Sequence, residues 1–105
     1  MYYSGGELYN NSGNNEKALE YFLKAYQFIK ENDYEVENIS KMEIGDLIYK
    51  ISKIYFENAD YEESEKVISV YKAYMKWSQV ILDDDTQIER DTIIDKILKK
   101  NVDKI

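Results

Sequence analysis

Residues 13–26, "GNNEKALEYFLKAY", decide the fold class of this chain. Ala18, Phe22 and Ala25 follow one another at intervals of four and three residues, so small, large and small side chains share one face of a helix. Such a face fits closely against a second helix. The stretch therefore predicts one member of a helical pair whose other member precedes it in the chain.

Polar residues mark the ends of this helix. Either Asn14 or Asn15 can serve as its N-cap, and Glu16 is favoured in the first turn by the helix dipole. The helix is predicted from about Asn15 to Glu31. Its apolar face is made of Ala18, Leu19, Phe22, Ala25, Tyr26 and Ile29.

Two further helices flank this one in the prediction. The first is short, about residues 2–11. A later helix starts near Ser40, because Ser40 and Glu43 have the spacing of a capping box, and ends near Asn58. Its apolar stripe is Ile44, Leu47, Ile48, Ile51, Ile54 and Tyr55.

Two more helices are predicted in the C-terminal half of the chain. Asp60 can cap a long helix that extends to about Leu82, and Thr86 with Glu89 gives a second capping box, which starts a closing helix over about 86–101. The residues predicted to be buried on the long helix are Val67, Ile68, Tyr71, Tyr74, Met75, Trp77 and Val80. Those predicted to be buried on the closing helix are Ile88, Ile94, Ile97 and Leu98.

The chain contains no proline and no sustained two-residue alternation of polarity. It is therefore predicted to be all-α, with about five helices that form antiparallel helical hairpins.

Composition limits the function. The 105 residues predict a single domain, residues 1–105, and 21 acidic against 14 basic residues give a net charge of −7. That charge repels phosphate backbones and anionic lipids, so neither nucleic acid nor membrane is an expected partner. Lys99, Lys100 and Lys104 fit the dipole at a helix C-terminus. No membrane-span or signal-peptide pattern is present, which predicts a cytoplasmic location.

Catalysis and metal binding would have to rely on carboxylate, lysine and tyrosine side chains in this sequence. There is no histidine and no cysteine, so we expect neither an enzyme nor a cofactor. The stretch 83–94, "DDDTQIERDTII", has Ile88 where a calcium-binding loop needs glycine and Ile94 where it needs glutamate. Its carboxylates are interpreted as favouring a helix N-terminus, and no catalytic or metal site is predicted.

An internal repeat supports the helical pairs. Residues 8–26, "LYNNSGNNEKALEYFLKAY", can be laid over residues 54–72, "IYFENADYEESEKVISVYK". The matched positions are Tyr9 and Tyr55, Gly13 and Ala59, Ala18 and Ser64, Phe22 and Ile68, and Ala25 and Tyr71.

In these positions the chain resembles the tetratricopeptide-repeat family. The first copy carries the signature at Tyr2, Gly6, Tyr9, Gly13, Ala18, Phe22 and Ala25, and the second at Ile48, Ile51, Ser52, Tyr55, Ala59, Ser64 and Ile68. The resemblance implies a stack of helical hairpins, with repeat one over about 2–31, repeat two over about 40–82 and a closing helix. It also implies a module that binds proteins or peptides.

The resemblance has two departures. Ala18 and Ser64 are 46 residues apart, whereas the family period is 34, and neither copy ends in proline. Long, proline-free repeats are similar to those of the peptide-pheromone-sensing regulators of Gram-positive bacteria. That likeness implies the sensing part of a bacterial regulator.

Five residues are candidates for contact with a partner. Tyr3 and Tyr49 fall on the face that such arrays turn toward their concave groove, although a core or interface role is open for both. Lys50 and Lys53 are three apart on the same face, and Asn10 lies at the matching end of the first copy. We expect a peptide or protein segment with a carboxylate, and plain solvation of the lysines is the alternative.

The family's two-carboxylate clamp is not reproduced, because Glu7 stands where an amide donor is needed and Tyr3 where lysine is needed. A chaperone C-terminal tail is therefore disfavoured as a ligand. Two repeats also fall short of the three or so that are usually needed for stability. We accordingly expect a homo-oligomer, a homodimer in the first place, or a fragment of a longer array. The alternative function is a structural homodimerisation module with no separate ligand.

Overall fold

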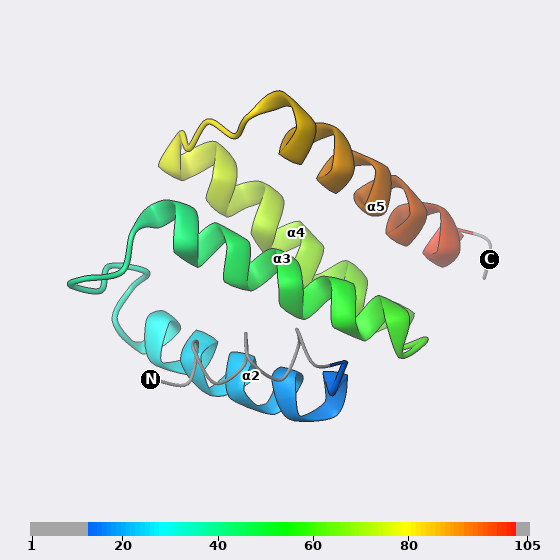
Figure 1. Ribbon diagram of the computed structural model, residues 1–105, viewed down its shortest axis with the longest axis horizontal. Helices are drawn as coiled ribbons and strands as arrows, with labels where there is room; N and C mark the ends of the chain where they lie inside the picture. The colour runs from blue at the N-terminus through cyan, green and yellow to red at the C-terminus, as the bar shows by residue number, and fades with distance from the viewer. Residues whose placement is uncertain (1–12, 103–105) are drawn as a thin grey trace. The chain divides into compact units, whose positions relative to one another are not determined.

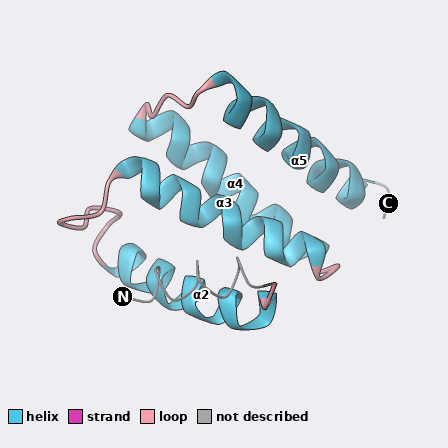
Figure 2. Ribbon diagram, in the orientation of Figure 1, coloured by secondary structure: helices cyan, strands magenta, loops and turns pink. Residues whose placement is uncertain are grey.

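The computed structural model describes residues 13–102, which form four α-helices (Figure 1). These are α2 (Asn15–Glu31), α3 (Lys41–Glu57), α4 (Tyr61–Ser78) and α5 (Asp84–Val102). Figure 2 shows only helices and loops in this part of the chain, so the predicted all-α fold is confirmed. The helix predicted over residues 2–11 lies outside the described residues.

The chain divides into two compact units, and the boundary falls inside α3, between Leu47 and Ile48. Among the described residues, the first unit contains α2 and the start of α3. The second contains the remainder of α3 with α4 and α5. The assignment of residues 1–105 to one domain stays a prediction.

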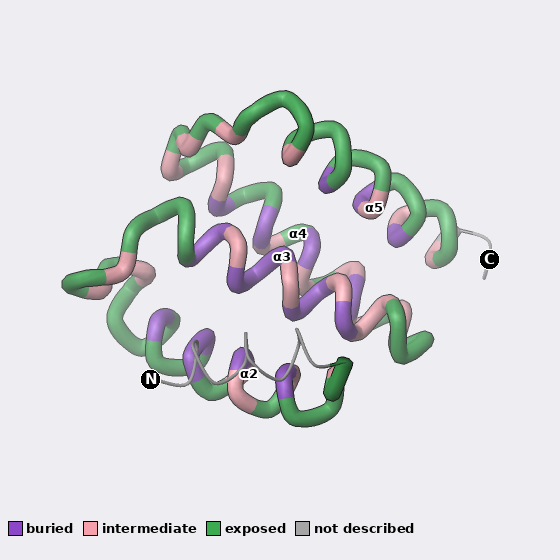
Figure 3. The backbone as a smooth tube through the Cα atoms, viewed as in Figure 1, coloured by how far each residue is buried: buried purple, intermediate pink, exposed green. Residues whose placement is uncertain are grey.

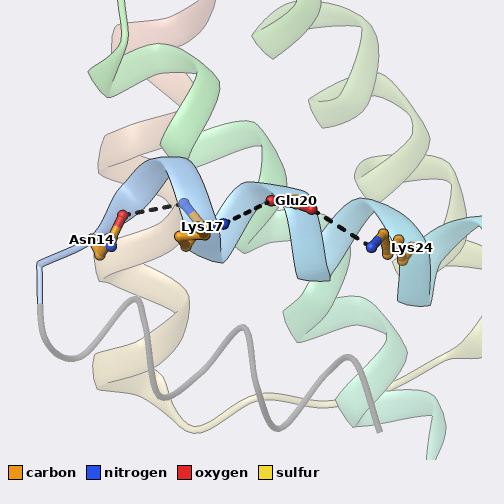
Figure 4. A network of polar contacts seen from close by, with 4 residues as sticks. All are labelled: Asn14, Lys17, Glu20 and Lys24. Carbon is orange, nitrogen blue, oxygen red and sulfur yellow. Dashed lines mark hydrogen bonds and ion pairs between the residues drawn. The ribbon is translucent and has the colours of Figure 1, made fainter.

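In the first unit, α2 has the predicted bounds. The side-chain oxygen of Asn14 accepts a hydrogen bond from the Lys17 backbone N–H at 3.2 Å, which makes Asn14 the N-cap (Figure 4). On the outer surface, the Glu20 carboxylate lies 3.7 Å from Lys17 Nζ and 3.6 Å from Lys24 Nζ. These ion pairs are solvent-exposed and contribute little. Burial of the opposite face stabilises the helix, through Ala18, Phe22, Ala25, Tyr26 and Ile29.

The end of α2 is a Schellman motif. The Asp33 N–H donates to the Lys30 carbonyl at 3.1 Å, and the Tyr34 N–H donates to the Ile29 carbonyl at 2.9 Å. Asp33 has φ +56°, the left-handed conformation that this motif requires. The motif brings the hydroxyl of Tyr34 to 3.3 Å from that of Tyr26, and burial raises the pKa of Tyr26.

The predicted capping box at the start of α3 is confirmed. Ser40 Oγ accepts a hydrogen bond from the Glu43 N–H at 3.1 Å, and the Glu43 carboxylate accepts one from the Ser40 N–H at 3.5 Å. The stripe that follows is buried as predicted at Ile44, Leu47, Ile48, Ile51 and Ile54, whereas Tyr55 is half-buried.

A second Schellman motif ends α3. The Ala59 N–H donates to the Phe56 carbonyl at 3.0 Å, and the Asp60 N–H donates to the Tyr55 carbonyl at 2.8 Å. Ala59 has φ +61°, and Gly13, its partner in the internal repeat, has φ +83°. The two matched positions therefore share a left-handed backbone. Asp60 occupies the predicted N-cap position of α4, although its side chain makes no capping hydrogen bond.

The helices α3 and α4 contact each other at two buried serines, Ser52 and Ser64. Ser52 Oγ donates to the Ser64 carbonyl at 2.8 Å, and Ser64 Oγ donates to the Ser52 carbonyl at 2.8 Å. The two hydroxyl oxygens lie 3.2 Å apart, and neither residue is exposed. Only small side chains allow two helices to exchange hydrogen bonds with each other's backbone in this way. These are the small positions that the repeat signature predicts.

The helix α4 ends at Ser78, before the predicted end near Leu82. Gln79 has φ +57°, and its N–H closes the last turn on the Met75 carbonyl at 3.1 Å. The predicted helix was too long because Val80 and Leu82 continue the apolar pattern in a non-helical connection.

The start of α5 also differs from the prediction. The helix begins at Asp84, and the carbonyl of Asp83 accepts the N–H of Gln87 at 3.0 Å, so Asp83 is the residue that caps it. Its carboxylate accepts hydrogen bonds from the Thr86 N–H at 3.1 Å and from Thr86 Oγ1 at 2.7 Å. The capping box predicted from Thr86 and Glu89 is wrong, because Thr86 is already inside the helix and acts as a donor.

The helices α4 and α5 pack as an antiparallel hairpin. Near the end of α5, Asn101 Nδ2 donates to the carbonyl of Tyr61, the first residue of α4, at 3.0 Å. Figure 3 shows most of α5 exposed, with buried positions along one side. Those positions are Arg90, Ile94 and Ile97.

Two predicted core residues of this hairpin are exposed. Ile88 is 64% exposed, because it lies nine positions before Ile97 and therefore about 180° away from it around α5. Trp77 is 58% exposed, although its ring centroid lies 5.8 Å from that of Tyr74. Placing these two side chains in the core was wrong.

Candidate functional site

Lys50 and Lys53 lie at the edge of the buried face of α3. Both are half-buried, and the residues between and beside them, Ile51, Ser52 and Ile54, are at most 2% exposed. A lysine at such an edge buries its aliphatic stem and carries its ammonium group toward water. The two lysines, one turn apart, place two positive charges on one side of α3 in a protein of net charge −7.

Tyr49 is buried beside them and is 5% exposed. Its ring centroid lies 5.7 Å from that of Tyr71, with an interplanar angle of 53°, and 4.7 Å from the guanidinium carbon of Arg90. Of the two roles left open for Tyr49, the structure supports the core role. Neighbouring side chains cover its ring, so a contact between Tyr49 and a ligand stays a prediction that this packing does not favour.

Arg90 is the residue of this region that the sequence analysis missed. It is 8% exposed, and its Nη1 donates to the Tyr71 hydroxyl at 3.1 Å. A planar guanidinium can stack on an aromatic ring and donate a directed hydrogen bond at once. The sequence did contain a signal for its burial. Arg90 precedes Ile94 and Ile97 by four and seven positions, so the three residues share one helical face.

The remaining candidates, Tyr3 and Asn10, lie outside the described residues. The structure therefore places three of the five candidates. It puts Lys50 and Lys53 at the edge of the buried face of α3 and buries Tyr49 on the same helix.

Two further properties apply to the described part of the chain. No group of carboxylates there is arranged to hold a metal ion. None of the helices α2–α5 has both the length and the apolar character needed to cross a bilayer.

Comparison with known proteins adds no relative. No protein-family model matches the sequence, and neither curated proteins nor solved structures give a match.

Proposed function

We propose that this chain is a protein-interaction module of the tetratricopeptide type, which binds a peptide or protein segment through a carboxylate. Lys50 and Lys53 on α3 carry the proposal. The hydrogen-bonded serine pair at the expected small positions, and the left-handed backbone at both Gly13 and Ala59, favour the repeat assignment. A cytoplasmic location and a sensing role in a bacterial regulator belong to the same proposal.

The lysines bind the ligand by charge-assisted hydrogen bonds. Each ammonium group donates to a carboxylate oxygen, and each such contact contributes roughly 1 kcal/mol at a partly exposed site. Both lysines belong to a helix that is already buried along the neighbouring face, so little backbone order has to be gained on binding. Tyr49 supports this side of α3 from within, through its packing on Tyr71 and Arg90.

The test is a charge reversal at both lysines, Lys50→Glu with Lys53→Glu. The probe is an array of acidic peptides, each synthesised with a free and with an amidated C-terminus, and binding is measured by fluorescence anisotropy. The double variant should bind the best free-carboxylate peptide at least about tenfold more weakly, because two contacts are lost and repulsion is added. Helicity by circular dichroism should be unchanged.

A matched control is available on α4. Lys72→Glu with Lys76→Glu changes the net charge by the same amount at two exposed lysines of that helix. The affinity of this control variant for the free-carboxylate peptide should stay within about threefold of that of the parent protein, because only long-range electrostatics are altered. Equal weakening in both double variants, or no binding of any peptide by the parent protein, would remove Lys50 and Lys53 as the binding site.

The alternative is a homodimerisation module without a separate ligand. The exposure of Phe28 at 48% and of Met42 at 51% favours it. Light scattering over a range of protein concentrations separates the two functions. A dimer that persists in the Lys50 and Lys53 double variant, combined with failure to bind any peptide of the array, would favour dimerisation.

A further inference from the structure

Three residues with exposed apolar side chains lie at one end of the α4–α5 hairpin. Trp77 is 58% exposed, Ile81 87% and Ile88 64%. Trp77 lies in the last turn of α4, Ile81 in the connection and Ile88 in the first turns of α5. Since the two helices are antiparallel, all three belong to the end of the hairpin where the chain turns. We call them the hairpin-end residues.

Large apolar side chains with this much exposure are few in the described part of the chain. Among residues 13–102, the only other exposed large apolar side chains are Phe28 and Met42, in the first unit. Tryptophan is among the residue types that dominate protein interfaces, and exposed aliphatic side chains at the same end add apolar area that a partner can cover.

The charge at this end is mainly negative. Residues 76–89 contain four carboxylates, those of Asp83, Asp84, Asp85 and Glu89, against one exposed lysine, Lys76, in the last turn of α4. All four residues are exposed. The pKa of the Asp83 carboxyl is held below its ordinary value by the hydrogen bonds from the side chain and backbone of Thr86, so this group keeps its charge at neutral pH.

We propose that the hairpin-end residues dock a partner segment whose apolar side chains are flanked by lysine or arginine. The apolar contacts supply the binding energy, and the four carboxylates select a basic partner. This surface is distinct from Lys50 and Lys53, and it prefers the opposite charge in its ligand.

The charge pattern also argues against two other occupants. A second copy of the chain in a twofold dimer would bring its own four carboxylates to the same contact, and like charges across an interface are costly. An anionic lipid surface would repel the same groups.

The experiment uses Trp77 as its own reporter, because it is the only tryptophan in the chain. Excitation at the red edge of the absorption band selects it over the tyrosines. The probes are two synthetic amphipathic helical peptides with identical leucine and phenylalanine positions. Lysine occupies every charged position of one and glutamate every charged position of the other.

The lysine peptide should shift the Trp77 emission to shorter wavelength and protect it from acrylamide quenching. Its dissociation constant should rise at least about tenfold between about 0.05 M and about 0.5 M NaCl, because the attraction is between exposed charges. The glutamate peptide should cause neither change at the same concentrations.

Substitutions with matched controls assign the site. Ile81→Ser with Ile88→Ser should weaken the lysine peptide at least about tenfold, whereas Phe28→Ser with Met42→Ser should leave it within about twofold. Asp84→Asn with Asp85→Asn should weaken it about fivefold. The control Glu62→Gln with Glu63→Gln, which neutralises two acids in the first turn of α4, should have less than half that effect.

Three results would overturn this proposal. The first is equal binding of the two peptides, and the second is an unchanged Trp77 signal with both. The third is a shift in Trp77 emission that depends on protein concentration without peptide and accompanies a doubled mass, which would assign the surface to a second copy. The charge reversal at Lys50 and Lys53 should not weaken the lysine peptide, so failure of either proposal can be recognised separately.

Discussion

At the scale of single residues, the size of the side chain at position 64 sets how closely α3 and α4 approach. Ser64→Leu should lower the free energy of unfolding by roughly 1–3 kcal/mol, because the added carbons have no space at a fully buried crossing. Ser64→Ala should cost less than about 1 kcal/mol, since alanine's helix propensity offsets part of the lost hydrogen bonding.

Ser69 provides the matched control, because it lies on the exposed side of the same helix. Ser69→Leu should change the free energy of unfolding by less than about 0.5 kcal/mol in urea denaturation. If Ser69→Leu and Ser64→Leu were equally destabilising, the close approach of the two helices would be contradicted.

Arg90 supports a second prediction at this scale. Arg90→Lys should destabilise the protein by roughly 1–2 kcal/mol, because an ammonium group cannot stack on Tyr49 and also donate in the guanidinium plane to Tyr71. Tyr71→Phe should cost about 1 kcal/mol. A double-mutant cycle followed by chemical denaturation should show a loss smaller than the sum of the two. Strict additivity would mean that the observed hydrogen bond contributes nothing to stability.

Individual residues were the hardest level to predict from the sequence. Periodicity identifies which residues share a face, and it placed Phe22, Ile48 and Ile68 in the core correctly. Periodicity does not say which face of a helix is covered by another helix, so Ile88 was wrongly predicted to lie in the core. It also treats arginine as polar, although the aliphatic part and flat guanidinium of Arg90 pack well between aromatic rings.

At the scale of the helix, Ala59 is a point of backbone strain. A left-handed conformation costs an L-residue with a Cβ roughly 1 kcal/mol, and glycine adopts it freely. Ala59→Gly should therefore raise the free energy of unfolding by up to about 1 kcal/mol, as measured by thermal and urea denaturation. Ala73→Gly, at an exposed position inside α4, should instead destabilise by about 1 kcal/mol. A destabilising effect of Ala59→Gly would contradict the Schellman motif.

The cap of α5 gives a prediction of pH dependence. The pKa of Asp83 is lower in the folded protein than its ordinary value of 3.8, so its contribution to stability is present above that value. The contribution is lost as the pH falls through the folded-state pKa. The melting temperature of Asp83→Ala should therefore lie below that of the parent protein at pH 6, and the difference should shrink as the pH is lowered below about 3.8.

Two controls separate the cap from the general effect of charge. Asp85→Ala removes the same charge within one helical turn of Asp83. Glu89→Gln tests the capping box that was predicted from Thr86 and Glu89 and that the structure does not contain. Each should lower the melting temperature less than Asp83→Ala at pH 6. A larger effect of Glu89→Gln would restore the predicted start of α5.

Helices were largely predictable because their signals are local. Asn14, Ser40 and Asp60 each precede a regular apolar pattern, and the three helices that follow begin where the sequence predicts. The start of α5 was misplaced because three consecutive aspartates and a threonine offer several capping registers. The end of α4 was misplaced because a left-handed residue other than glycine, here Gln79, carries almost no sequence signal.

At the scale of the whole molecule, a net charge of −7 opposes compactness. Added NaCl screens this repulsion, so the melting temperature should rise between about 0.02 M and about 0.5 M salt. Lys17→Glu, which removes one positive and adds one negative charge on an exposed surface and so changes the net charge by −2, should increase the salt dependence. A melting temperature that falls with salt would show that attractive ion pairs outweigh the repulsion.

The two proposed binding surfaces were only partly predictable at this scale. Lys50 and Lys53 came from charge and phase, which the sequence contains. The exposure of the hairpin-end residues depends on where α4 ends and on which face of α5 packs against α4. Neither of these follows from composition.

The serine crossing also bears on the order in which the chain folds. Ser52 and Ser64 are separated by 12 residues, whereas the contact between Tyr61 and Asn101 spans 40. Closing the longer loop costs about 1 kcal/mol more in chain entropy. We therefore expect the α3–α4 pair to form its contact before α5 packs, because the shorter loop closes at the lower entropic cost. In that order, α5 packs onto an α3–α4 pair that has already formed.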